Sequence, residues 1–143
     1  MSKEIYNLRN DGNHVAQVQH ATLHRPDAGL VSEQGLFGSD EWWASIQAGK
    51  IPVYSITGTI TRVYMSGHND YPEFEIDDGH SIISWTRLGA DSEYIVGRTV
   101  IIDYVLQRYK DNPDKKLNKK LKKILGEHSK CVLRVSVKEK NGT

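Results

Sequence analysis

The sequence contains a single cysteine and no long apolar run. Cys131 alone, among 143 residues, cannot form an internal disulfide. No apolar segment approaches the roughly 18 residues that a membrane-spanning helix needs. The first residues also lack the pattern of a secretory signal peptide, which has a basic segment, an apolar segment and then small residues. We therefore expect a cytoplasmic protein in a reducing setting that does not engage a membrane.

Common catalytic signatures are also missing. The chain has no phosphate-binding G-x-x-x-x-G-K-[ST] loop, no H-E-x-x-H helix, no G-x-S-x-G elbow and no C-x-x-C pair. His14, His20 and His24 would share one face of a regular strand, but no tight pair of ligands accompanies them. Cys131 has the same two-residue phase as Leu133 and Val135 in the last predicted strand, so we expect an inert thiol in the core. We predict no enzyme activity, no metal site and no cofactor.

The net charge of +1 conceals a strong asymmetry along the chain. Residues 108–143 hold 12 Lys and Arg against 4 Asp and Glu, whereas residues 1–107 hold 7 against 14. The two segments therefore carry charges of +8 and −7. Such asymmetry indicates either an acidic partner for the basic end, such as an acidic protein, or attraction between the two ends, for example across a homodimer.

The length of the chain and the positions of its glycine- and proline-containing loops indicate one domain over residues 1–143, with an N-terminal extension at 1–50. Within the extension, residues 4–8 and 14–23 are predicted to pair as a hairpin around Asp11-Gly12. A short helix over 39–49, capped by Ser39 or Asp40, carries two adjacent tryptophans.

The remaining chain is rich in strand-forming residues. Extended runs cover 51–65, 73–76, 81–88, 99–109 and 130–138, and Asp78-Gly79 predicts a tight hairpin between the second and third. Gly58 predicts a bulge or sharp coil halfway along the first run. A lysine-rich helix over 115–125 has a leucine stripe that would pack on the sheet. The fold class is therefore mainly β with two short helices.

These runs resemble a small OB-type barrel. The residues that carry the resemblance are 56–63, 74–79 and 96–102, with a glycine-kinked first strand and an Asp-Gly hairpin. The resemblance implies a five-stranded curled barrel over about 51–138 that binds single-stranded nucleic acid or oligosaccharide. The chain departs from that pattern because only 89–97 separates the third and fourth strands, and the helix precedes the last strand instead.

Cationic and aromatic residues alternate along the predicted strands. Residues two apart share a strand face, where rings can stack on bases and cationic groups can contact phosphate. We predict a non-enzymatic module for single-stranded nucleic acid. Its binding residues would be Arg62, Tyr64, Trp85, Arg87, Tyr104, Arg108, Lys119 and Lys122.

A row of acidic residues interrupts this basic pattern. Glu73, Glu75 and Asp77 alternate with Phe74 and Ile76. Carboxylates on one strand face can hold a divalent cation or act as acid and base, but no EF-hand spacing is present. We interpret the row as a solvated strand face that disfavours phosphate nearby.

The alternative prediction is a protein-interaction module, an adaptor or an inhibitor. Trp42 and Trp43 lie about 100° apart on a helix, so at most one of them points squarely at the core. The other, if exposed, would anchor a protein partner together with one charged end, because tryptophan is enriched in interface hot spots. A third possibility is a small ligand or sugar bound in the barrel cleft.

Overall fold

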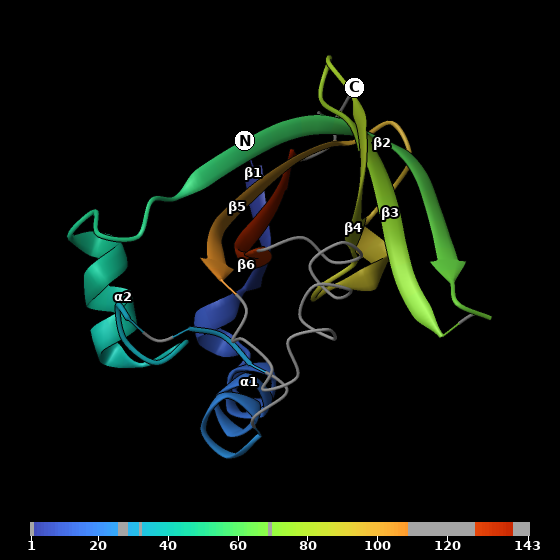
Figure 1. Ribbon diagram of the computed structural model, residues 1–143. Helices are drawn as coiled ribbons and strands as arrows, with labels where there is room; N and C mark the ends of the chain where they lie inside the picture. The colour runs from blue at the N-terminus through green and yellow to red at the C-terminus, as the bar shows by residue number, and fades with distance from the viewer. Residues whose placement is uncertain (1, 26–28, 32, 69, 109–127, 139–143) are drawn as a thin grey trace. The chain divides into compact units, whose positions relative to one another are not determined.

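The computed structural model describes residues 2–25, 29–31, 33–68, 70–108 and 128–138. These residues form six strands, two α-helices and two short 3₁₀ helices, which confirms a mainly β fold with two helices (Figure 1). The elements are β1 (Ser2–Asn7), η1 (Leu8–Asn10), α1 (Gly12–His24), α2 (Asp40–Gln47), β2 (Tyr54–Ser66), β3 (Tyr71–Asp77), β4 (Ile82–Thr86), η2 (Asp91–Glu93), β5 (Thr99–Arg108) and β6 (His128–Lys138).

The six strands form one sheet in the order β1-β6-β5-β2-β3-β4. Neighbours β1 and β6, β2 and β3, and β3 and β4 pair antiparallel. Over the described residues the sheet stays open, with β1 and β4 at its edges. The predicted count of five strands is wrong because β1 joins the sheet, where Lys3 opposes Val137. The likeness to an OB-type barrel stays a prediction.

The predicted N-terminal hairpin is also wrong, because its second arm is the helix α1. Asp11 caps this helix, its side chain accepting a hydrogen bond from the backbone N–H of His14 at 3.3 Å. The less exposed residues Val15, Val18 and Thr22 recur at spacings of three and four, which is the helical period. The prediction depends on Asp11-Gly12 as a tight turn, whereas in the structure Asp11 is the N-cap and Gly12 the first residue of α1.

The hairpin predicted at Asp78-Gly79 is confirmed between β3 and β4. The Asp78 carboxylate accepts hydrogen bonds of 2.8 Å from the backbone N–H groups of His80 and Ser81. These two hydrogen bonds lower the pKa of Asp78 below its ordinary value. Gly79 adopts a φ of +95°, which glycine tolerates without the steric cost of a Cβ.

The predicted bulge lies two to four residues beyond Gly58. The register of β2 against β3 shifts between Ile60 and Arg62, so the extra residue is Thr61. Gly58 serves a different purpose: a Cβ there would lie 2.8 Å from the carbonyl oxygen of Asp77, so glycine permits the close approach of the two strands.

Two compact units divide the described chain. Unit 1 comprises residues 1–7, 55–103 and 132–143, and unit 2 comprises residues 8–54 and 104–131. The largest fully buried side chains of unit 1 include Phe74, Ile60 and Ile76, and those of unit 2 include Trp42 and Leu8. The predicted helix over 39–49 is confirmed as α2, capped by Ser39. The predicted helix over 115–125 lies outside the described residues.

Candidate protein-binding surface

The bulge in β2 decides which way the predicted binding residues point. Ile60 opposes Ile76 on the buried face of the sheet, whereas Arg62, after the bulge, opposes Glu75 on the other face. Without the extra residue, Arg62 would share the buried face of Ile60, because residues two apart in a strand point the same way.

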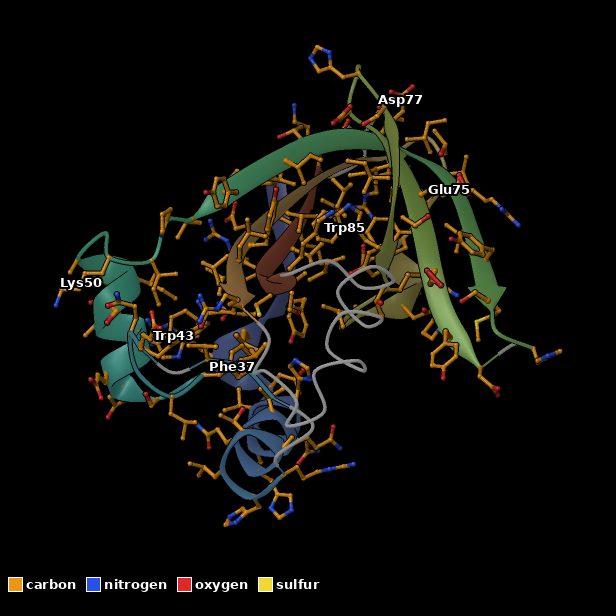
Figure 2. The ribbon with its side chains drawn as sticks, in the orientation of Figure 1. Phe37, Trp43, Lys50, Glu75, Asp77 and Trp85 are labelled. Atoms are coloured by element: carbon orange, nitrogen blue, oxygen red, sulfur yellow. The ribbon has the colours of Figure 1, made fainter. Side chains whose placement is uncertain are left out.

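Trp85 lies on the opposite side of the sheet from Arg62 and Tyr64. It opposes Phe74 in the β3–β4 register and is only 7% exposed. Figure 2 labels Trp85 on β4 and Glu75 on the neighbouring strand β3. The sheet therefore does not bring the Trp85 indole into one patch with the Arg62 guanidinium, which the predicted nucleic-acid surface required.

The predicted arginines are held by groups of the protein itself. Arg62 Nη1 lies 3.2 Å from Glu75 Oε1, and its guanidinium carbon lies 4.2 Å from the centre of the Tyr64 ring. The Arg87 side chain is only 9% exposed, and its Nη1 lies 2.9 Å from an oxygen of Asp91. Arg87 Nη2 also donates to the backbone oxygen of Tyr64 at 3.0 Å. Carboxylates thus occupy positions that phosphate groups would need.

Of the other four predicted residues, the structure describes two, and both lie in unit 2. Tyr104 stacks on Tyr54 in unit 2, with ring centres 5.6 Å apart. Arg108, also in unit 2, lies 3.8 Å from a carboxylate oxygen of Glu33. Lys119 and Lys122 fall outside the described residues, as does the lysine-rich segment that suggested an acidic protein partner.

The two adjacent tryptophans point in different directions, as predicted for neighbours on a helix. Trp42 is fully buried and donates from Nε1 to Gln107 Oε1 at 3.1 Å, and its ring contacts Phe37. Trp42 therefore cannot contact a partner. Trp43, labelled in Figure 2, is half-buried. Its ring meets that of Trp42 edge-on, with ring centres 5.0 Å apart, and lies under the guanidinium of Arg9 at 4.0 Å.

Unit 2 also contains a shallow groove with a volume of about 250 Å³. Its wall combines apolar side chains with groups of both charges, and no paired acid and base of a hydrolytic site lies among them. The residues that line it are Val31, Glu33, Gln34, Lys50, Ile51, Pro52, Leu106, Gln107 and Arg108.

The outward face of β2, β3 and β4 is the second distinctive surface of the described chain. Cross-strand partners share a face, so the register puts one set of side chains on it. We call this set the acidic sheet face. Its members are Thr59, Arg62, Tyr64, Ser66, Tyr71, Glu73, Glu75, Asp77, Ile82, Ser84 and Thr86.

Two members of the acidic sheet face were not singled out from the sequence. Tyr71 and Ile82 are each 62% exposed, although both are large and apolar. The sequence alternation could have identified them, because Tyr71 and Ile82 are separated by odd numbers of residues from Phe74 and Trp85 and so lie on the opposite face of their strands. The acidic row lies on the outward face of β3, where Asp77 is exposed and Glu73 and Glu75 are half-buried.

The pKa values of two buried ionisable side chains, Cys131 and Tyr94, indicate a structural role for these groups and not a catalytic one. Burial raises the pKa of Cys131 to about 11, which confirms a thiol in the core that is poorly suited to be a nucleophile. Burial likewise raises the pKa of Tyr94 to about 12. Over the residues that the structure describes, no three His, Cys, Asp or Glu side chains are grouped to hold a metal ion. None of the described helices has the length and apolar character needed to cross a membrane.

Fold and surface together define a small, mainly β protein with an exposed face of carboxylate and aromatic side chains. A family model described as "Immunity protein RhsI2" matches residues 2–137. The chain therefore belongs to the RhsI2 immunity protein family. No curated protein matches it.

Membership of this family overturns the main functional prediction. An immunity protein acts on another protein, so the prediction of a module for single-stranded nucleic acid is wrong. The family instead favours the alternative prediction, a protein-interaction module that serves as an inhibitor. Alternating Arg and aromatic residues form one surface only when their strand faces agree, and Trp85 lies on the opposite face of the sheet from Arg62 and Tyr64.

Proposed function

We propose that this protein binds a protein toxin and inhibits it by direct contact. The observation that carries the proposal is the match of residues 2–137 to an immunity protein family, which leaves only the ends of the chain unmatched. On this proposal the protein acts as an inhibitor, without catalysis or cofactor. It acts in the cytoplasm, where a single thiol such as Cys131 remains reduced.

Trp43 is the side chain of α2 that we propose as an anchor for the toxin. Its indole contacts both the ring of Trp42 and the guanidinium of Arg9, so little side-chain entropy would be lost on binding. Tryptophan combines a large apolar area with one N–H donor, which explains its enrichment in interface hot spots.

The proposal is tested with the cognate toxin in cells and with purified proteins. Cells that produce the toxin should survive only when this chain is also produced, and the two proteins should form a stable complex in calorimetry and gel filtration. Trp43→Ala should weaken the complex by about tenfold, as expected for a hot-spot truncation of more than about 1 kcal/mol. Absence of both a complex and protection would refute the proposed function.

A further inference from the structure

We propose that the toxin docks on the acidic sheet face and that it presents a basic, partly apolar surface there. This inference rests on the proposed function, because it names a surface, additional to Trp43, through which the toxin would be contacted. It concerns only unit 1, in which all members of the acidic sheet face lie.

Charge is the first argument for a basic partner. Between Arg62 and Arg87 the chain contains five Asp and Glu residues and no Lys or Arg. Unit 1 as a whole holds seven Lys and Arg against ten Asp and Glu, whereas unit 2 holds twelve against eight. On the acidic sheet face itself, three carboxylates stand against the single guanidinium of Arg62. A partner with positive charge would be attracted to this face and guided onto it.

Exposed apolar groups at both ends of the acidic row are the second argument. Ile82 opposes Asp77 at one end of β3, and Tyr71 opposes Ser66 at the other end. Both Ile82 and Tyr71 are 62% exposed. Burial of these two side chains by a partner would add apolar affinity to the electrostatic attraction of the carboxylates between them.

The internal contacts of the face are the third argument, because they hold its polar groups in position. Arg62 Nη1 lies 3.2 Å from Glu75 Oε1. The Tyr64 hydroxyl donates to Ser84 Oγ at 3.1 Å, and the Ser66 hydroxyl donates to a Glu73 oxygen. Side chains that are already ordered lose less entropy when a partner binds.

The size of the face suits the centre of an interface. The seven residues of β3 extend about 20 Å, and three neighbouring strands add about 10 Å of width. A standard interface covers about 800 Å² on each partner, so the acidic sheet face would supply its middle and surrounding loops its rim.

The experiment compares two variants of the face with two matched controls elsewhere. Glu75→Lys reverses a charge that is paired with an arginine, and its control Glu33→Lys reverses a carboxylate paired with Arg108 in unit 2. Ile82→Ala truncates a side chain that is 62% exposed, and its control Leu23→Ala truncates one that is 63% exposed on α1. Each variant is titrated with purified cognate toxin by calorimetry, and its thermal transition is recorded.

We expect Glu75→Lys to raise Kd by about tenfold or more, and Ile82→Ala to raise it by about fivefold. Each control should stay within about twofold of the wild type, since it leaves the face intact. The Kd of the wild type should rise with salt, and that of Glu75→Lys should rise less steeply, because screening weakens the attraction that the carboxylate supplies. If Glu75→Lys lacks a thermal transition, Glu75→Gln replaces it, with an expected rise in Kd of about threefold.

Three results would overturn the inference. The first is a wild type that binds and inhibits the toxin while the face variants bind equally well, which leaves the proposed function standing. The second is a loss of self-association by the face variants in sedimentation without any change in toxin binding, which would make the face a contact between copies. The third is a wild type that binds no toxin, which removes the proposed function and the inference together.

Discussion

Tyr94 illustrates how a single buried hydroxyl holds a loop. It is 4% exposed, donates to the backbone oxygen of Leu88 at 2.7 Å and accepts from the backbone N–H of Leu88 at 3.1 Å. Its ring packs against Phe74, with ring centres 4.7 Å apart. Burial raises the pKa of Tyr94 to about 12, and the hydroxyl is protonated and able to donate at neutral pH even without this shift.

Tyr94→Phe should therefore lower the free energy of unfolding by about 1 kcal/mol, because it removes two part-buried hydrogen bonds to the backbone of Leu88. Urea denaturation of the variant and the wild type measures the difference. Tyr71→Phe is the control, since the Tyr71 side chain is 62% exposed, and it should change stability little. Equal midpoints for Tyr94→Phe and the wild type would contradict the role of this hydroxyl.

Cys131 provides a second prediction at the residue scale. Its pKa of about 11 means that only a small fraction of the thiol is ionised at pH 8. We expect alkylation by iodoacetamide to be about 100-fold slower in the native protein than in the unfolded chain, where the pKa returns to about 8.5. Mass spectrometry over time measures both rates. Similar rates with and without urea would argue against burial of the thiol.

At the element scale, the β3–β4 hairpin depends on the conformation of its turn. Gly79 has a φ of +95° with open space around it, so a substitution there meets backbone strain and no steric neighbour. Gly12, at the start of α1, also has open space, but its φ is not positive. Because a Cβ would meet no neighbour at either position, a comparison of the two glycines isolates the effect of backbone conformation.

Gly79→Ala should destabilise the protein by about 1–2 kcal/mol, the cost of placing a Cβ in the left-handed region. Gly12→Ala should be neutral or stabilising by up to about 1 kcal/mol, because alanine favours the helix and restricts the unfolded chain. Thermal unfolding of the two variants measures both signs. A destabilisation of the same size at both positions would show that the conformation of Gly79 is not the cause.

Elements whose determinants are local were predictable from the sequence. The β3–β4 hairpin follows from Asp78-Gly79, and α2 follows from Ser39 and the acidic residues after it. Helix α1 was missed because its apolar positions are few, so the helical period of Val15, Val18 and Thr22 was hidden among polar residues.

At the scale of the whole molecule, one carboxylate connects both ends of the chain. Glu93 Oε1 lies 2.6 Å from Lys3 Nζ, and Glu93 Oε2 lies 2.7 Å from Arg98 Nη1. Arg98 Nε in turn donates to the backbone oxygen of Lys138 at 2.8 Å. The hydrogen bonds from Lys3 and then from Arg98 lower the pKa of Glu93 below its ordinary value of 4.5.

This carboxylate predicts an acid-dependent stability. A lowered folded-state pKa means that the contribution is present above about pH 4.5 and is lost as the pH falls through the folded-state pKa. The thermal midpoint of the wild type should therefore fall on acidification, and Glu93→Gln should reduce that dependence while lowering the midpoint at pH 7. Calorimetry between pH 7 and pH 3 provides the test. An identical dependence in both proteins would exclude Glu93 as a cause.

The candidate surface needed more than the sequence. Spacing correctly put Arg62 with Tyr64 and identified the acidic row, and adjacency correctly separated Trp42 from Trp43. Residue spacing could not show which face of the sheet each side chain occupies, because the extra residue at Thr61 changes the side of β2 on which Arg62 lies. Nor could spacing show that Trp85 opposes the buried Phe74.

The sequence by itself determined the mainly β class, the hairpin at Asp78-Gly79, the capped helix with its two tryptophans and the buried thiol. All of these depend on neighbours in the chain or on simple periodicity. Only the tertiary structure decided that β1 completes the sheet, that Trp42 rather than Trp43 is buried, and that acidic and aromatic groups share an exposed face. These outcomes depend on pairing between distant segments, whose register no local pattern specifies.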